Sequence, residues 1–106
     1  MRILLDECVP RPLLRELSMH DVHTVPEMGW SGTRNGQLLA AMAAAGFEVF
    51  LTVDQNLQFQ QNLATSSVAT IVLCAVSNRL ADLLPLMPRV HTVLSSIRPG
   101  QHVEVR

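Results

Sequence analysis

Short aliphatic runs alternate with amphipathic segments along the whole chain. An aliphatic run bounded by polar residues is typical of a buried strand, whereas apolar residues spaced three or four positions apart predict one face of a helix. Strands are therefore expected at residues 2–6, 20–25, 47–54, 68–76 and 102–106. Helices are expected at residues 12–18, 37–46, 55–64 and 78–100.

This order predicts an α/β fold with a mainly parallel central sheet of about five strands. Parallel strands need crossover connections, and the helices in those crossovers cover both faces of the sheet, which gives three layers, α/β/α. The run at 68–76, "VATIVLCAV", is the most hydrophobic and is expected at the sheet centre, whereas 102–106 alternates and is expected at an edge. Pro85 and Pro88 predict a break in the last helix. One domain, residues 1–106, accounts for the whole pattern.

Acidic side chains follow two of the predicted strands. Asp6 and Glu7 end the first strand and Asp54 ends the third. In open α/β sheets, ligands bind beyond the carboxyl ends of the strands, where the strand order reverses. We expect Asp6 and Asp54 to face each other there. The sequence "DQNL" at 54–57 also fits the start of a helix with Asp54 as its N-cap, so a cap and a site stay open as interpretations.

Carboxylates gathered in one cleft repel each other unless a positive charge separates them. Mg²⁺ or Mn²⁺ is the usual solution, since these ions bind a few carboxylates and several waters. Such an ion can orient a phosphodiester and lower the pKa of an attacking water. The acids at residues 6 and 54 therefore predict a site for Mg²⁺ or Mn²⁺.

Composition restricts what this site can act on. Apolar residues make up 48% of the 106-residue chain, and the net charge of −1 excludes a general electrostatic attraction to nucleic acid. All eight basic residues are arginine. Arg11, Arg34 and Arg79 follow strands on the same predicted edge as the acids, where they would contact phosphate or serve as ordinary surface arginines. Asn56, in the amide-rich segment 55–64, would either donate hydrogen bonds to RNA or face solvent.

Other residues carry weaker signals. Cys8 and Cys74 are expected to be buried, reduced thiols, and Trp30 either packs its loop onto the core or stacks on a base. The histidines lack zinc spacing and are expected to be structural or exposed: His20, His23, His91 and His102. No apolar run is long enough to span a bilayer, and acids interrupt the N-terminus before any signal-type region, so a cytoplasmic location without membrane association is expected.

Three segments in this order resemble a known family. "ILLDECVPRPLLREL", "HTVPEMGWSGTRNGQLLAAMAAAGFEVFLTVDQNL" and "TIVLCAVSNR" are similar to the small PIN-like toxin family often labelled DUF5615, which is related to the nuclease domain of VapC-type toxins. The resemblance covers nearly the whole chain. It implies a PIN-like fold, metal-dependent RNA cleavage and the role of toxin in a type II toxin–antitoxin pair. The implied partners are an RNA substrate, a small antitoxin with a helix-turn-helix DNA-binding segment, and a second copy of the chain in a homodimer.

The resemblance also assigns site residues. Asp6 matches the first-strand acid with Glu7 beside it, and Asp54 matches the acid after the third strand. Many relatives carry an acid where this chain has Asn35, whose amide oxygen can ligate a metal but adds no charge. The sequence after the fourth strand, "VSNR", also lacks an expected acid. These residues support one loosely held Mg²⁺ or Mn²⁺, with Asp6 and Asp54 as ligands, Asn35 assisting, and Glu7 as a supporting group or base.

Two other functions fit the same residues. A non-catalytic binding module with a PIN-like scaffold would explain the missing acids. A phospho-accepting receiver domain would also place an acidic pair after strand 1 and an aspartate after strand 3. Receivers, however, use a lysine near the end of strand 5, and this chain contains no lysine.

Overall fold

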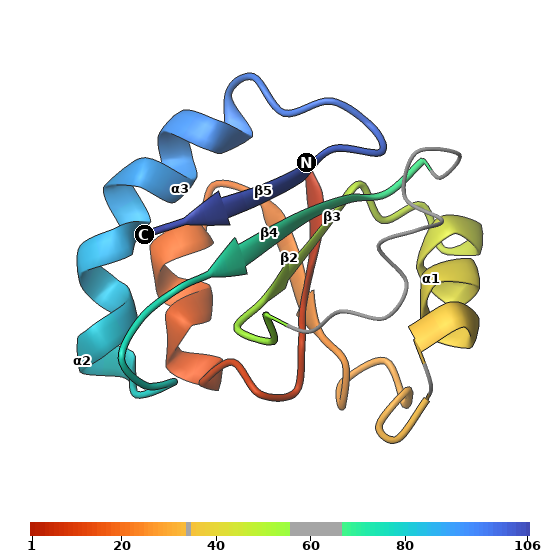
Figure 1. The fold of residues 1–106 in the computed structure, drawn as a ribbon. Helices are drawn as coiled ribbons and strands as arrows, with labels where there is room; N and C mark the ends of the chain where they lie inside the picture. The colour runs from red at the N-terminus through yellow and green to blue at the C-terminus, as the bar shows by residue number, and fades with distance from the viewer. Residues whose placement is uncertain (34, 56–66) are drawn as a thin grey trace.

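The fold is built on one five-stranded sheet in which all neighbouring strands are parallel. The structure, a computed structural model, describes residues 1–33, 35–55 and 67–106. The strand order is β2-β1-β3-β4-β5 (Figure 1). The strands are β1 (Arg2–Leu5), β2 (Asp21–Thr24), β3 (Val49–Thr52), β4 (Ala69–Leu73) and β5 (His102–Val105). The predicted α/β class and the count of about five strands are confirmed.

Burial along each strand follows its place in the sheet. Every residue of β3 and β4 is buried, and β1 is buried from Ile3 onward, because these strands have a neighbour on both sides. At the edges, β2 and β5 each bury only their last residue, and β5 is an edge strand as predicted. The prediction that the most hydrophobic strand lies at the centre is wrong, because β3 holds the middle position and β4 lies one place further out.

The helices differ from expectation in type and length. The predicted helix at 12–18 is a 3-10 helix, η1 (Arg11–Leu17), which has a proline in its first turn. α1 (Asn35–Ala44) begins two residues earlier than predicted, and Gly46 follows it with a φ of 81°, a conformation that favours glycine. The C-terminal segment divides at its prolines into α2 (Leu80–Leu83), η3 (Leu84–Leu86) and α3 (Met87–Leu94). The helix predicted at 55–64 lies outside the described residues, except for its first position.

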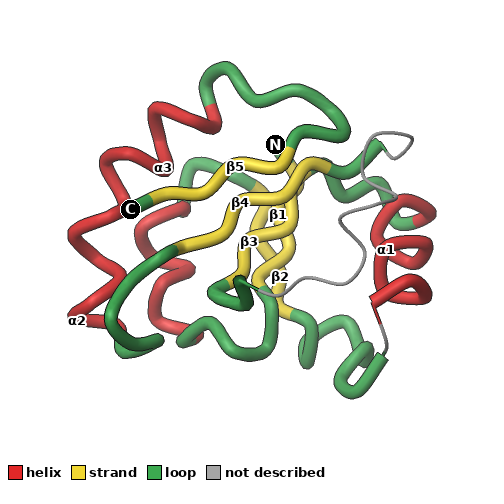
Figure 2. Tube along the Cα trace, in the orientation of Figure 1, coloured by secondary structure: helices red, strands yellow, loops and turns green. Residues whose placement is uncertain are grey.

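Two hydrophobic clusters lie on opposite sides of the sheet. One packs side chains of alternate strand residues, such as Leu5 and Ile71, against η1, α2 and α3. The other packs the intervening residues, such as Leu4 and Phe50, against α1. Figure 2 shows α1 on one side of the strands and α2 with α3 on the other. Within the described ranges, no helix has the length and apolar content needed to cross a membrane.

Candidate functional site

The candidate site lies where the strand order reverses, beyond the carboxyl ends of β1 and β3. These two strands are paired in the register Leu5 with Leu51. Directly after β1, the backbone N–H of Asp6 donates to the carbonyl of Leu51 over 2.9 Å. This bond continues the β1–β3 pairing by one residue, and it places the first acid of the chain beside the end of β3. Crevices at such reversal points are where open α/β sheets bind ligands.

Thr52, the last residue of β3, connects the two predicted acids. Its hydroxyl donates to Oδ2 of Asp6 over 2.7 Å and accepts the backbone N–H of Asp54 over 3.0 Å. The Thr52 side chain is fully buried, so its hydroxyl has little freedom to rotate to other partners. A single oxygen atom therefore fixes the Asp6 carboxylate relative to the start of the loop that carries Asp54.

Two further groups hold the Asp6 carboxylate. The backbone N–H of Glu7 donates to Oδ1 over 2.8 Å, and the Cys8 thiol lies 3.4 Å from Oδ2. Cys8 is a free, half-buried thiol, less buried than predicted, and desolvation by burial raises its pKa. An ionised carboxylate is an acceptor at both oxygens, with room for more than one partner at each. Oδ1, with one hydrogen bond, keeps room for a cation.

A cavity of about 330 Å³ joins the acids. Asp6, Glu7 and Asp54 all line it, together with Thr33 before α1, Leu38 in its first turns and Phe50 of β3. The predicted pair therefore borders one cavity. Within the described ranges, no group of three or more His, Cys, Asp or Glu side chains is arranged to hold a metal ion. An ion in this cavity would therefore have at most two of these carboxylates, with water or amide oxygens as its other donors, and hard oxygen donors of this kind suit Mg²⁺ or Mn²⁺.

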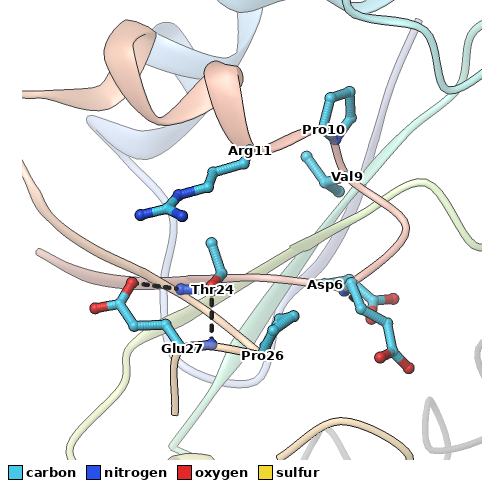
Figure 3. Close-up of a pocket in the computed structure, with 8 residues that line it drawn as sticks. Asp6, Val9, Pro10, Arg11, Thr24, Pro26 and Glu27 are labelled. Carbon is cyan, nitrogen blue, oxygen red and sulfur yellow. Dashed lines mark hydrogen bonds between the residues drawn. The ribbon is translucent and has the colours of Figure 1, made fainter. Parts of the chain in front are cut away.

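Two more cavities flank this one, and Glu7 lines all three. A cavity of about 560 Å³ is lined by Asp6, Glu7, Arg11, Thr24, Glu27 and three apolar residues (Figure 3). On the other side, a cavity of about 460 Å³ is lined by residues that include Asn78 and Arg79. Two of the three predicted phosphate-binding arginines thus border the cavities next to the acids.

The remaining predicted residues are not placed against these cavities. Asn35 is the first residue of α1, close in sequence to Thr33 and Leu38, but the position of its side chain falls outside the described part of the structure. The predictions for Arg34 and Asn56 concern residues that also fall outside it. Their roles stay predictions.

The loop after β4 is tied to the loop after β1. The side-chain amide of Asn78 donates to the carbonyl of Cys8 over 3.1 Å. The Ser77 hydroxyl accepts the backbone N–H of Arg79 and donates to the carboxylate of Asp82 in α2. The loop after β4 therefore holds the backbone beside Asp6 through the neutral side chain of Asn78. This is the loop in which the family resemblance led us to expect an acid that the chain lacks.

Sequence reasoning missed a charged cluster around His23 on β2. Its Nδ1 lies 2.7 Å from Oε2 of Glu27 and its Nε2 lies 2.8 Å from Oδ1 of Asp21. Asp21 also pairs with Arg2 over 3.0 Å. The Arg2 guanidinium lies 4.5 Å from the centre of the Phe47 ring, and the rings of Trp30 and His23 both meet Phe47 edge-on. Trp30 thus packs onto the core, as one of its two interpretations predicted.

Stability should depend on the charge of His23. The hydrogen bond to Glu27, followed by that to Asp21, raises the pKa of His23 above 6.5, and the His23 bond lowers the pKa of both carboxyls. The stabilisation from the imidazolium is therefore complete below pH 6.5 and is lost as pH rises through the raised pKa. We expect the melting temperature of wild type to exceed that of His23→Gln by a few degrees at pH 6 and by less at pH 9. His102→Gln, on the exposed edge strand, should not show this pH-dependent difference.

Comparison of the chain with protein-family models, with curated proteins and with solved structures finds no match in any of the three. The function must therefore be argued from the residues of the site.

Proposed function

We propose that this chain is a metal-dependent endoribonuclease that hydrolyses RNA phosphodiester bonds, with Asp6 and Asp54 as ligands of Mg²⁺ or Mn²⁺. The observation that carries the proposal is the shared cavity at the strand-order reversal, where Thr52 orients the Asp6 carboxylate next to the Asp54 loop. A bound divalent ion would supply charge stabilisation at the phosphate and acidify a bound water. The oxygen donors present suit such an ion.

The other residues divide the remaining tasks. Glu7 lines all three cavities, which supports a role for its carboxylate in accepting a proton from an attacking water or in holding that water. Arg11 and Arg79 border the cavities on either side, where guanidinium groups can bind phosphates of a bound strand. Asn35 would add a neutral oxygen ligand from the first turn of α1. Arg34 and Asn56 complete the proposed RNA contacts.

The resemblance to small PIN-like toxins supports a biological role. In that role the chain is the toxin of a type II pair in the cytoplasm. Its partner is a small antitoxin with a helix-turn-helix segment, and it can form a homodimer. Expression of the chain alone should arrest growth, and co-expression with the product of a short neighbouring reading frame should relieve the arrest. Growth arrest is thus a readout of this role.

Metal binding and RNA cleavage test the proposal directly. We expect saturable binding of Mn²⁺ by calorimetry and cleavage of single-stranded RNA in Mg²⁺ or Mn²⁺ that stops on addition of EDTA. Asp54→Asn should weaken both, whereas Glu16→Gln should change neither, because Glu16 lies in the last turn of η1 and does not line any of the three cavities. An absence of both saturable heat and cleavage would favour the non-catalytic binding module instead.

A receiver-type phospho-acceptor is a second candidate, favoured by one observation. The strand order β2-β1-β3-β4-β5 is the flavodoxin-like order that receivers also have, with its ligand site between β1 and β3. The acids at residues 6, 7 and 54 suit that chemistry, but no lysine is present to contact a phosphoryl group. Incubation with acetyl phosphate and mass spectrometry of the Asp54 peptide distinguishes the two: a phosphorylated Asp54 supports the receiver, and an unmodified one supports the nuclease.

A further inference from the structure

The cavity of about 560 Å³ next to the acids is lined by side chains of both charges. Its lining holds the carboxylates of Asp6, Glu7 and Glu27 and one guanidinium, that of Arg11. Within the described residues Arg11 makes no hydrogen bond or ion pair, so its donors are available to a ligand. An anion attracted to Arg11 would be repelled by three carboxylates unless their charges were compensated. A metal ion bound by Asp6 and Asp54 would compensate the charge of Asp6 and reduce the repulsion from the adjacent Glu7, whereas Glu27 needs another partner.

His23 supplies the compensation for Glu27. Both ring nitrogens of His23 lie within hydrogen-bond distance of carboxylate oxygens, at 2.7 Å from Glu27 and 2.8 Å from Asp21. Ionised carboxylates only accept hydrogen bonds, and a neutral imidazole has a single N–H to donate. Both contacts can therefore be hydrogen bonds only when His23 is an imidazolium. The described geometry is that of the charged histidine.

The Glu27 carboxylate connects this cluster to the cavity. Figure 3 shows the side chains of Glu27 and Arg11 directed to one side of the cavity and Asp6 on the other. The pKa of Glu27 is lowered first by its hydrogen bond to His23 and also, more weakly, by the charge of Arg11. The Glu27 carboxylate is therefore stabilised by two cations: His23, which lies outside the cavity, and Arg11, which lines it.

We propose that the cavity lined by Arg11 is a phosphate-binding site, and that protonated His23 maintains its affinity for phosphate by neutralising Glu27. When His23 loses its proton, Glu27 keeps a negative charge that no longer has a full cationic partner. That charge then offsets Arg11, through its field or by moving toward the guanidinium. Phosphate binding at Arg11 accordingly weakens as His23 is deprotonated.

The groups around His23 are consistent with this direction. Asp21 faces it from β2 and is itself paired with Arg2 from β1, and the Phe47 ring meets it edge-on. Asp21 thus keeps a cationic partner after His23 deprotonates. Among the described residues, Arg11 is the one other cation that acts on Glu27, so the loss of the proton acts chiefly on the cavity side. The raised pKa of His23 places this change above pH 6.5.

The identity of the phosphate rests on the proposed function. Both cavities share Asp6 and Glu7, so a strand whose scissile phosphate sits at the acids would place a neighbouring phosphate near Arg11. Arg11 would bind a free phosphate ion through the same contacts as a phosphate group of RNA. The experiment therefore includes both ligands and does not depend on cleavage.

Binding is measured in EDTA by fluorescence anisotropy with a labelled single-stranded oligoribonucleotide, in an Asp6→Asn background that excludes cleavage and removes one cavity charge. Glu7 is present in every variant, so its charge affects all of them equally, and the test compares each variant with this background. We expect affinity to fall about fivefold or more between pH 6 and pH 9. Adding Arg11→Gln should give weak binding at both pH values. Adding Glu27→Gln should give tight binding at both, and adding His23→Gln should give weak binding at both. Adding Arg89→Gln on α3, or Glu16→Gln, should leave the pH dependence unchanged.

Circular dichroism and melting curves confirm that each variant is folded. The proposal is overturned if Arg11→Gln binds like its parent, or if Glu27→Gln keeps the full pH dependence.

Inorganic phosphate is titrated against the same variants as a competitor. If it binds as tightly per phosphate as RNA and with the same pH dependence, the site is assigned to a free anion; weaker competition assigns it to RNA. If RNA binding follows the expected pattern but wild type cleaves no RNA, the site stands and the nuclease proposal fails.

Discussion

Replacing Asp6 by Asn is expected to reduce metal-dependent RNA cleavage by more than about a hundredfold and to relieve growth arrest. The carboxylate is one of two proposed metal ligands, and loss of a group that merely supports a ligand already costs about 10–100-fold in affinity or activity. Asn keeps the size of Asp and one acceptor oxygen, so the backbone bond from Asp6 to Leu51 should survive. Cleavage is measured as an initial rate at several Mn²⁺ concentrations.

The matched control is Glu16→Gln, which removes one carboxylate from the last turn of η1. It should cleave at the wild-type rate, and both variants should give the wild-type circular dichroism spectrum. Undiminished cleavage or growth arrest in a folded Asp6→Asn protein would contradict the assignment of Asp6 as a metal ligand.

Replacing Thr52 by Val is expected to weaken Mn²⁺ binding by about 10–100-fold without unfolding the protein. Valine fills nearly the same buried volume but lacks the hydroxyl that donates to Asp6 and accepts from Asp54. Hydrogen-bonded neighbours of metal ligands typically contribute this much because they fix ligand orientation. Calorimetric titration with Mn²⁺ measures the affinity, and RNA cleavage at saturating Mn²⁺ shows whether rate is recovered when metal is in excess.

Thr52→Ser is the matched variant, because it keeps the hydroxyl and removes only a methyl group. We expect it to bind Mn²⁺ within about threefold of wild type, although its loss of buried apolar surface lowers thermal stability slightly. If Ser and Val variants lose affinity equally, the methyl group and its packing matter rather than the hydroxyl. Equal affinity in all three proteins would remove Thr52 from the positioning of Asp6.

Strand positions and strand-end acids were readable from the sequence because each depends on local pattern. Aliphatic runs mark buried strands, and an acid directly after such a run must lie at the carboxyl edge of the sheet. That is why Asp6, Glu7 and Asp54 could be named in advance, although their metal-binding role is still a prediction. Strand order was not readable to the same depth, since hydrophobicity distinguishes internal from edge strands but does not rank β3 against β4.

The features that the sequence did not reveal depend on side-chain contacts and backbone geometry that the hydrophobic pattern does not encode. Thr52 reads as an ordinary β-former, and only the β1–β3 pairing brings its hydroxyl to Asp6. His23 has no metal-type spacing; Asp21 lies two residues before it on the same face of β2, and Glu27 meets it because the chain turns directly after β2. The 3-10 form of η1 was also hidden, because a proline near its start is equally compatible with an α-helix.

The hydrogen bond from the Asn78 side chain to the carbonyl of Cys8 has a consequence for how the site forms during folding. Residues 6, 52 and 78 come from distant parts of the chain, and parallel pairing offers no local hairpin that could assemble early. A nascent chain therefore lacks a formed site until β4 and the loop after it have left the ribosome. Fragments that end before residue 78 should be inert even though they contain both acids.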